Sequence, residues 1–180
     1  MDHPDRRPLA ESYWVVPGRF LAGEYPGHWL AEEARRRLDL FLQAGFDTFI
    51  DLTFPGELEP YETILYELAN GFGLKAAYHR FPVNDFGLPD PEQMHSTLDA
   101  IDLAISSRRK LYLHCLGGIG RTGTTVGCFL VRHGMNGEQA LRQLAGLWQE
   151  VPKSSRFTQS PETPLQRQFI LDWQEAASGR

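Results

Sequence analysis

The chain has 180 residues, of which 42% are hydrophobic and 23% are charged, and its formal net charge is −5 at pH 7. This length suits one domain, and the composition lacks the low hydrophobicity and high charge of a disordered protein. The net negative charge provides no general electrostatic reason to bind nucleic acid or an anionic membrane, so we expect neither partner.

The amino terminus lacks the apolar core of a signal peptide, and no apolar stretch approaches the roughly 20 residues of a membrane span. We therefore expect a cytoplasmic monomer, with residues 1–12 as a flexible tail and residues 13–177 as a single domain. Two cysteines, Cys115 and Cys128, are too few for a disulfide framework and lack the paired spacing of a zinc site. We expect neither a metal nor a cofactor.

Hydrophobic periodicity and turn residues divide the domain into alternating strands and helices. Apolar residues at helical spacing, followed by Gly45, predict for example a helix from His28 to Ala44. We predict two strands within 14–26, broken at Pro17-Gly18, further strands at 46–53, 75–81 and 109–115, and helices over 28–44, 59–69, 92–106, 122–133, 138–150 and 164–177.

This alternation of strands and helices implies right-handed crossovers, and hence a mainly parallel sheet. We expect an α/β fold in which a twisted sheet of about five strands is covered by helices on both faces. Ligands of such folds bind at the carboxyl ends of the strands, so the functional residues should lie on the loops that follow the strands.

The segment from His114 to Gly123, HCLGGIGRTG, places Cys115 at the end of the last predicted strand and Arg121 at the start of the next helix. A glycine-rich turn there can direct successive backbone N–H groups toward an anion, and the helix dipole adds partial positive charge. This field favours the thiolate form of Cys115, and the planar fork of Arg121 suits two oxygens of a phosphoryl group. The pattern predicts an anion site with a cysteine nucleophile.

The cysteines and the glycine pattern also allow other interpretations. A lone cysteine at a strand end is usually a small buried hydrophobe, which is the alternative for Cys115. Cys128, in the apolar run GCFLV, is interpreted as a core residue. Gly118, Gly120 and Gly123 also match the dinucleotide fingerprint G-x-G-x-x-G. That fingerprint needs a second parallel strand that carries an acidic residue, whereas Glu138 begins a predicted helix and no later segment has the pattern of a strand.

HCLGGIGRTG resembles the H-C-x-x-G-x-x-R-[ST] loop of the protein tyrosine phosphatase superfamily, and the size and helix order resemble its compact dual-specificity branch. The resemblance covers residues 14–173. It implies a phosphatase that forms a cysteinyl-phosphate on Cys115, with Arg121 as the phosphate clamp. It further implies that Thr122 assists thiolate release and that His114 orders the loop. The loop residues that would bind the substrate phosphate are Leu116, Gly117, Gly118, Ile119 and Gly120.

A carboxylic acid should reach the site, because an alkoxide or phenoxide leaving group needs a proton as its bond to phosphorus breaks. VNDFGLP, residues 83–89, resembles the W-P-D-x-G-x-P loop of the superfamily, with Asp85 at the position of the acid. Val83 and Asn84 replace the W-P pair. Asp85 could instead form an Asx-turn, whereas Asp90 is predicted to cap the helix that follows.

Two further segments are predicted to approach the site. Glu57, on a loop after a strand, could orient the clamp arginine, and Tyr61 could pack on an aromatic substrate, although ordinary loop roles suit both residues equally well. ETPLQRQF, residues 162–169, resembles the family segment Q-T-x-x-Q-Y-x-F, whose first glutamine positions the hydrolytic water. Glu162 occupies that first position and only Gln166 is retained, so either residue could position the water.

The loop between Cys115 and Arg121 has no lysine, whereas phosphoinositide phosphatases of this superfamily tend to have lysines there. A phosphorylated protein is therefore the expected substrate, with phosphotyrosine and phosphoserine or phosphothreonine both open. The cluster Arg108, Arg109 and Lys110 precedes its strand and is predicted to be a solvated patch at the opposite end of the sheet. Alternatives are a phosphatase of a small or lipid phosphoester, a rhodanese-like or arsenate-reductase-like enzyme, and an inactive phosphopeptide-binding module.

Overall fold

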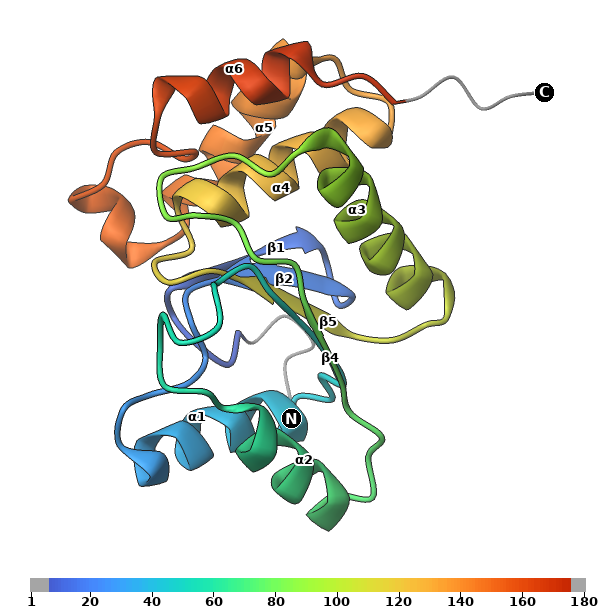
Figure 1. The fold of residues 1–180 in the computed structure, drawn as a ribbon, viewed down its shortest axis with the longest axis vertical. Coiled ribbons are helices and arrows are strands. Elements are labelled where there is room, and N and C mark those ends of the chain that lie inside the picture. The colour runs from blue at the N-terminus through green and yellow to red at the C-terminus, as the bar shows by residue number, and fades with distance from the viewer. Residues whose placement is uncertain (1–6, 176–180) are drawn as a thin grey trace.

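A computed structural model describes residues 7–175. Within them the chain forms one five-stranded sheet, six α-helices and a short 3-10 helix (Figure 1). The strands are β1 (Ser12–Val16), β2 (Phe20–Gly23), β3 (Thr48–Asp51), β4 (Ala77–Arg80) and β5 (Leu111–His114). The helices are α1 (Ala31–Gln43), α2 (Glu62–Gly71), α3 (Pro91–Ser106), α4 (Gly120–Arg132), α5 (Gly137–Gln149), η1 (Pro152–Ser155) and α6 (Pro164–Asp172).

The sheet has the order β1-β2-β5-β3-β4, and only the pairing of β1 with β2 is antiparallel among the described strands. A turn at Gly18, which has φ +70°, joins these two strands. β5 lies at the centre, parallel to β2 on one side and to β3 on the other. Its carboxyl end therefore lies between those of two other strands, and the residue that follows it is Cys115.

Helices cover both faces of the sheet, as predicted: α1 and α2 lie on one face and α3 to α6 on the other (Figure 1). Because side chains alternate along a strand, β5 contributes to both cores. Leu111 and Leu113 belong to the hydrophobic cluster formed with α3, α4 and α5, and Tyr112 belongs to the cluster formed with α1 and α2. The fully buried β5 thus anchors the loop after it from both sides.

Several element ends differ from the prediction. The first helix begins at Ala31 rather than His28, whose Nδ1 accepts a hydrogen bond from the backbone of Leu30. The last helix ends at Asp172, because the backbone of Trp173 is extended and its ring packs on His95 at 4.7 Å between centroids. The part of the predicted helix at 176–177 lies outside the described residues. The short helix η1 was not predicted.

Part of the predicted amino-terminal tail contacts the domain. Arg7 donates to the carbonyl of Ser12, and Ser12 is the buried first residue of β1. Glu11 accepts a hydrogen bond from the backbone N–H of Lys153 at 3.0 Å. Residues 1–6 of that tail lie outside the described residues. Across residues 7–175, the helices are too short or too polar to span a lipid bilayer.

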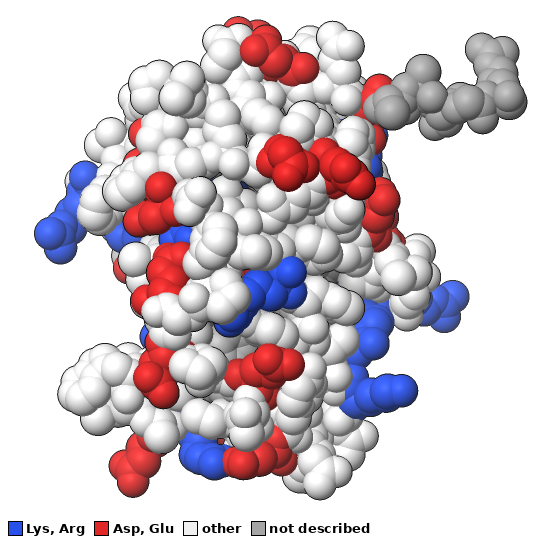
Figure 2. Space-filling model, in the orientation of Figure 1, with Lys and Arg blue, Asp and Glu red and all other residues white. Residues whose placement is uncertain are grey.

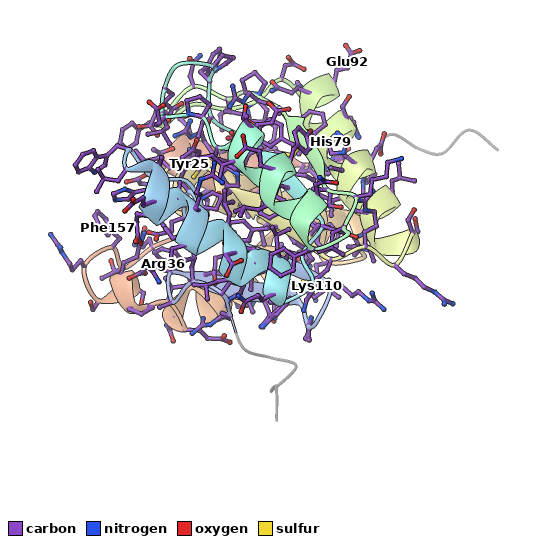
Figure 3. All side chains as sticks on the ribbon, turned by 90° about the horizontal axis from the view of Figure 1, so that it is seen from below. Tyr25, Arg36, His79, Glu92, Lys110 and Phe157 are labelled. Carbon is purple, nitrogen blue, oxygen red and sulfur yellow. The ribbon has the colours of Figure 1, made fainter. Side chains whose placement is uncertain are left out.

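The basic cluster 108–110 precedes β5, so it lies at the opposite end of the strands from the residues that follow β2, as predicted. In Figure 3, Lys110, which precedes β5, lies well away from Tyr25, which follows the parallel strand β2. The prediction of a solvated patch was wrong for two of its members. Arg109 donates to the carbonyl of Lys75 at 2.6 Å, and the ammonium of Lys110 donates to the carbonyl of Ala44 at 2.8 Å. These side chains bind loop carbonyls that the sequence pattern does not reveal.

Candidate active site

The segment after β5 makes a tight turn around the sulfur of Cys115. The backbone N–H of Gly118 donates to Sγ of the buried Cys115 over 3.3 Å, and α4 begins two residues later at Gly120. Gly118 has φ +74°, and a Cβ there would lie 2.4 Å from the backbone carbon of Gly23. Glycine is therefore required at this position by both conformation and space.

The carbonyl groups of this turn are bonded from outside it. Leu116 O accepts from the backbone N–H of Tyr25 at 3.0 Å, and Ile119 O accepts from Oγ of Ser160 at 2.8 Å. A third carbonyl, that of Gly117, accepts from the ammonium of Lys153 at 3.1 Å. None of these three donors was predicted from the sequence, since they lie far from the loop along the chain.

Arg121 lies on the first turn of α4 with its side chain only 1% exposed. Its two terminal nitrogens donate to the two carboxylate oxygens of Glu57 at 2.8 and 2.7 Å, and one of them also donates to the carbonyl of Val83 at 3.1 Å. The hydrogen bonds from Arg121 lower the pKa of Glu57. The predicted contact of Glu57 with the arginine is present, in a bidentate geometry that fixes the guanidinium plane.

Two buried polar atoms beside this turn have no hydrogen-bond partner among the described residues. They are Nε of Arg121 and Oγ1 of Thr122. The resemblance implied that Thr122 assists thiolate release, but its hydroxyl makes no hydrogen bond to the sulfur in this structure, and Gly118 donates to the sulfur instead. Because a buried donor without a partner is costly, these atoms are suited to bind a ligand.

Asp85 lies on the loop between β4 and α3, with its side chain 49% exposed. One of its carboxylate oxygens is 3.2 Å from a terminal nitrogen of Arg121, so the predicted acid and the predicted clamp meet across two loops. The next residue, Phe86, has φ +58°, an unusual conformation for a bulky residue. Asp90 caps α3 through the backbone N–H of Gln93 at 2.8 Å, as predicted.

Glu162 and Gln166, the two candidates for positioning water, are placed differently. Both ends of the buried Gln166 amide are engaged: Oε1 accepts from the backbone of Thr163 at 3.1 Å, and Nε2 donates to the carbonyl of Gly87 at 3.2 Å. Both side chains lie beside Gly120, the first residue of α4, since a Cβ there would be 3.0 Å from the Gln166 amide and 3.2 Å from Oε2 of Glu162. Burial and the nearby negative charge of Asp85 raise the pKa of Glu162.

His114 is completely buried under the turn. Its Nε2 is hydrogen-bonded to the hydroxyl of Tyr61 at 2.7 Å, and its Nδ1 lies 3.3 Å from the carbonyl oxygen of Cys115. Burial lowers the pKa of His114 and favours the neutral ring. The suggestion that Tyr61 packs on a substrate was wrong, because that side chain is 1% exposed and supports His114 from beneath.

The model of the family described as Swiss Army Knife protein, DSP-PTPase phosphatase domain (PTP-SAK), matches residues 9–167. The chain belongs to this family. It is therefore a member of the protein tyrosine phosphatase superfamily, as the loop from His114 to Gly123 indicated.

Two curated relatives of this phosphatase-family domain have different descriptions. A protein of Arabidopsis thaliana described as "Phosphatidylinositol 3,4,5-trisphosphate 3-phosphatase and protein-tyrosine-phosphatase PTEN1" is 24% identical over 131 residues, which are 72% of this chain and 30% of that protein. Cyclin-dependent kinase inhibitor 3 of Sus scrofa is 30% identical over 86 residues, 47% of this chain and 39% of that protein. The chain thus spans about a third of the length of these relatives.

The fold is shared with solved phosphatases. The crystal structure of kinase associated phosphatase, with serine in place of its catalytic-site cysteine, superposes with a TM-score of 0.69 at 19% identity and covers 88% of this chain and 90% of that one. The α/β fold predicted from the sequence is confirmed by this likeness and by the sheet itself.

The family's turn is surrounded by negative charge in this domain. Glu57, Asp85 and Glu162 approach Arg121 from three different loops. Figure 2 shows acidic groups along the left edge of the view, with basic groups beside them, where the loops after β3 and β4 lie in Figure 1. No group of three or more His, Cys, Asp or Glu side chains within residues 7–175 is arranged to hold a metal ion.

The second cysteine lies apart from this chemistry. Cys128 is completely buried in the core on α4, and burial raises the pKa of its thiol. Both cysteines are free thiols. The interpretation of Cys128 as a core residue is confirmed by its burial.

Proposed function

We propose that this domain is a metal-independent phosphatase that hydrolyses phosphomonoesters through a cysteinyl-phosphate on Cys115, with phosphorylated proteins as substrates. The observation that carries the proposal is the set of donors around one sulfur. The N–H of Gly118 is bonded to Sγ, and the buried Nε of Arg121 and Oγ1 of Thr122 have no partner among the described residues. A phosphoryl group bound there would satisfy these donors with its oxygens.

In the first step, the thiolate of Cys115 attacks phosphorus as the bond between phosphorus and the leaving oxygen breaks. Asp85 donates its proton to that oxygen, so the leaving group departs as an alcohol or phenol. The placement of Asp85 supports this role, because its carboxyl group lies 3.2 Å from Arg121, at the edge of the phosphate site. The loop N–H groups and Arg121 stabilise the charge on the transferring oxygens.

In the second step, water attacks phosphorus and the sulfur–phosphorus bond breaks, which regenerates the thiolate and releases phosphate. Asp85, now a carboxylate, accepts the proton of the water. Thr122 rotates its free hydroxyl toward the departing sulfur. We assign the water to Glu162, because both ends of the Gln166 amide are already hydrogen-bonded, and we assign to Gln166 the task of holding the acid loop through Gly87.

The residues around the site support a phosphorylated protein side chain, above all phosphotyrosine, as the substrate. Exposed apolar side chains stand next to three of the site residues along the chain: Phe54 is near Glu57, Phe86 follows Asp85, and Leu116 follows Cys115. An apolar rim suits an aromatic phosphoester. The three carboxylates around Arg121 disfavour a second phosphate, because neighbouring negative charges repel a polyanionic headgroup.

Phosphate release tests this function. With an aryl phosphate we expect turnover that a chelator does not reduce, and with peptides we expect phosphotyrosine to be hydrolysed faster than phosphoserine or a trisphosphorylated inositol lipid. Faster hydrolysis of the lipid would overturn the substrate assignment. Binding of a phosphotyrosine peptide without release would support an inactive module, and turnover of a sulfur donor or arsenate without phosphatase activity would support the rhodanese-like or arsenate-reductase-like alternative.

A further inference from the structure

The peptide unit between Gly117 and Gly118 is bonded at both ends, to partners on opposite sides. Its N–H, on Gly118, donates to Sγ of Cys115 at 3.3 Å, and its carbonyl oxygen, on Gly117, accepts from the ammonium of Lys153 at 3.1 Å. The N–H and C=O of a trans peptide point in opposite directions, so a donor that holds the oxygen outward also directs the N–H inward. Lys153 therefore acts on the sulfur through one rigid plane.

This peptide unit needs an external constraint. Glycine stands on both sides of it, and glycine populates backbone conformations on both sides of φ = 0 with little steric cost. Gly118 is wedged against the backbone of Gly23, but a Cβ on Gly117 would meet only the side chain of Ile119, at an ordinary 3.5 Å. A rotated peptide would turn its carbonyl oxygen toward Cys115, where its partial negative charge would destabilise a thiolate.

Lys153 is itself held before any substrate binds. Its side chain is 18% exposed, and its ammonium also contacts Oε2 of Glu24 at 2.8 Å. The other oxygen of Glu24 accepts from Arg37 at 2.6 Å, and Arg37 further donates to the carbonyl of Gly27. Since these groups come from η1, from the loop after β2 and from α1, three separate elements fix the lysine.

From these contacts we infer that Lys153 is a positioning residue for the nucleophile: it holds the Gly117–Gly118 peptide with its N–H on the sulfur of Cys115 and so stabilises the thiolate. The inference rests on the proposed function, since it concerns the same sulfur. Lys153 is not assigned a contact with the phosphate. Its contacts are the carbonyl of Gly117 and the carboxylate of Glu24, and Arg121 is the cation that interacts electrostatically with Cys115.

The test compares Lys153→Met with the matched control Arg156→Met, which removes an exposed cation three residues further along the chain. The readout is the rate at which iodoacetamide alkylates Cys115 between pH 5 and pH 8, with the label located by mass spectrometry and Cys115→Ser as the blank. Lys153→Met should lower this rate about ten-fold at the acidic end, the worth of a hydrogen bond to a charged group. The acidic limb of kcat/KM should move to higher pH by a matching amount.

Lys153→Arg, which retains a cationic donor, should restore most of the alkylation rate, whereas a merely structural lysine would affect the melting temperature and not the alkylation. A folded Lys153→Met protein with the wild-type alkylation rate and pH profile would overturn the inference. If Lys153→Met does not fold, Glu24→Gln takes its place, because it removes the anchor of the lysine: a smaller slowing in the same direction is expected, and an unchanged rate would again overturn the inference. A wild-type protein that is alkylated at Cys115 but releases no phosphate would show that the proposed function has failed. This result is distinct from a failure of the inference about Lys153.

Discussion

The two loops that meet at the candidate site are held in different ways. Most of the turn after β5 is buried, although the side chain of Leu116 is exposed. Its carbonyls at Leu116, Gly117 and Ile119 are bonded from outside, and it joins a central strand to a buried helix. The loop that carries Asp85 is exposed at its tip, and its contacts with the site are one ion pair to Arg121 and hydrogen bonds made by the carbonyls of Val83 and Gly87.

This difference separates two demands of the chemistry. The donors that bind phosphate must be fixed before the substrate arrives, because their stabilising effect depends on preorganisation. The acid must approach a leaving group of variable size and afterwards accept a proton from water, and an exposed loop can move at little cost in free energy. The strain at Phe86, with φ +58°, lies in the loop that can move rather than in the turn.

The largest effect should come from the fixed turn. Cys115→Ser should abolish turnover, since a serine hydroxyl at this position is not activated as a thiolate is, while the fold and the binding of vanadate persist. Phosphate release and a melting curve with and without vanadate are the measurements. More than trace turnover in this variant would remove the covalent mechanism.

On the exposed loop, Asp85→Asn should lower turnover by roughly 10²- to 10⁴-fold, the usual range for general acid catalysis. The loss should be large with phenyl or alkyl phosphates and smaller with activated aryl phosphates, because a good leaving group needs less protonation. The basic limb of the pH–rate profile should also flatten.

Asp90→Asn is the control for that variant, because asparagine also caps a helix well and Asp90 bonds only the start of α3 here. An inactive Asp90→Asn together with an active Asp85→Asn would mean that the acid lies five residues further along the chain than we propose.

Arg121→Lys should reduce kcat/KM by about 10²- to 10³-fold, the cost of removing a preorganised donor at the reacting oxygens. Lysine keeps the positive charge but cannot offer two parallel donors to Glu57 or to a phosphoryl group. Steady-state kinetics with an aryl phosphate measure this loss. A rate close to that of the wild type would show that charge alone suffices.

Glu57→Gln tests how the guanidinium plane is held. We expect kcat/KM to fall about ten-fold, in line with the loss of a hydrogen bond between charged groups. Because Arg121 lowers the pKa of Glu57 below 4.5 in the folded state, the pair stabilises the fold above that pH, and this stability is lost as the pH falls through the lowered pKa. The melting temperature should therefore decline less steeply from pH 7 to pH 3 in the variant than in the wild type. An equal decline would argue against a charged pair.

The smallest effect should come from Glu162→Gln, and we expect it in KM for a phosphate ester. Removing one partly solvated charge near the phosphate should lower KM about two- to three-fold. Because burial and Asp85 raise the pKa of Glu162, its charge appears at a higher pH than usual, so KM of the wild type should rise over that range and KM of the variant should not. A variant with a higher KM at every pH would contradict a repulsive carboxylate. The value of kcat should change little, because the glutamine amide can still hydrogen-bond the hydrolytic water. A large fall in kcat would mean that the carboxylate itself is needed there.

The sequence by itself determined the turn after β5 and the residues next to it along the chain. A strand, a cysteine, closely spaced glycines, an arginine and a helix lie within a few residues of one another, so backbone geometry alone places Cys115 and Arg121 at one helix end. The cap at Asp90 is equally local. Glu57 and Asp85 could be suggested from the sequence because both follow parallel strands, whose carboxyl ends share one edge of the sheet.

Only the tertiary structure decided which side chains hold the turn in place and which are buried. Lys153 and Ser160 bond carbonyls of a loop more than thirty residues earlier in the chain, and no periodicity or turn chemistry links such distant residues. Tyr61 was suggested as a residue that packs on an aromatic substrate, yet it is buried against the sheet and its hydroxyl is hydrogen-bonded to His114. Local hydrogen bonding determines where a helix or turn begins, whereas the burial and partners of a side chain depend on which distant elements pack over it.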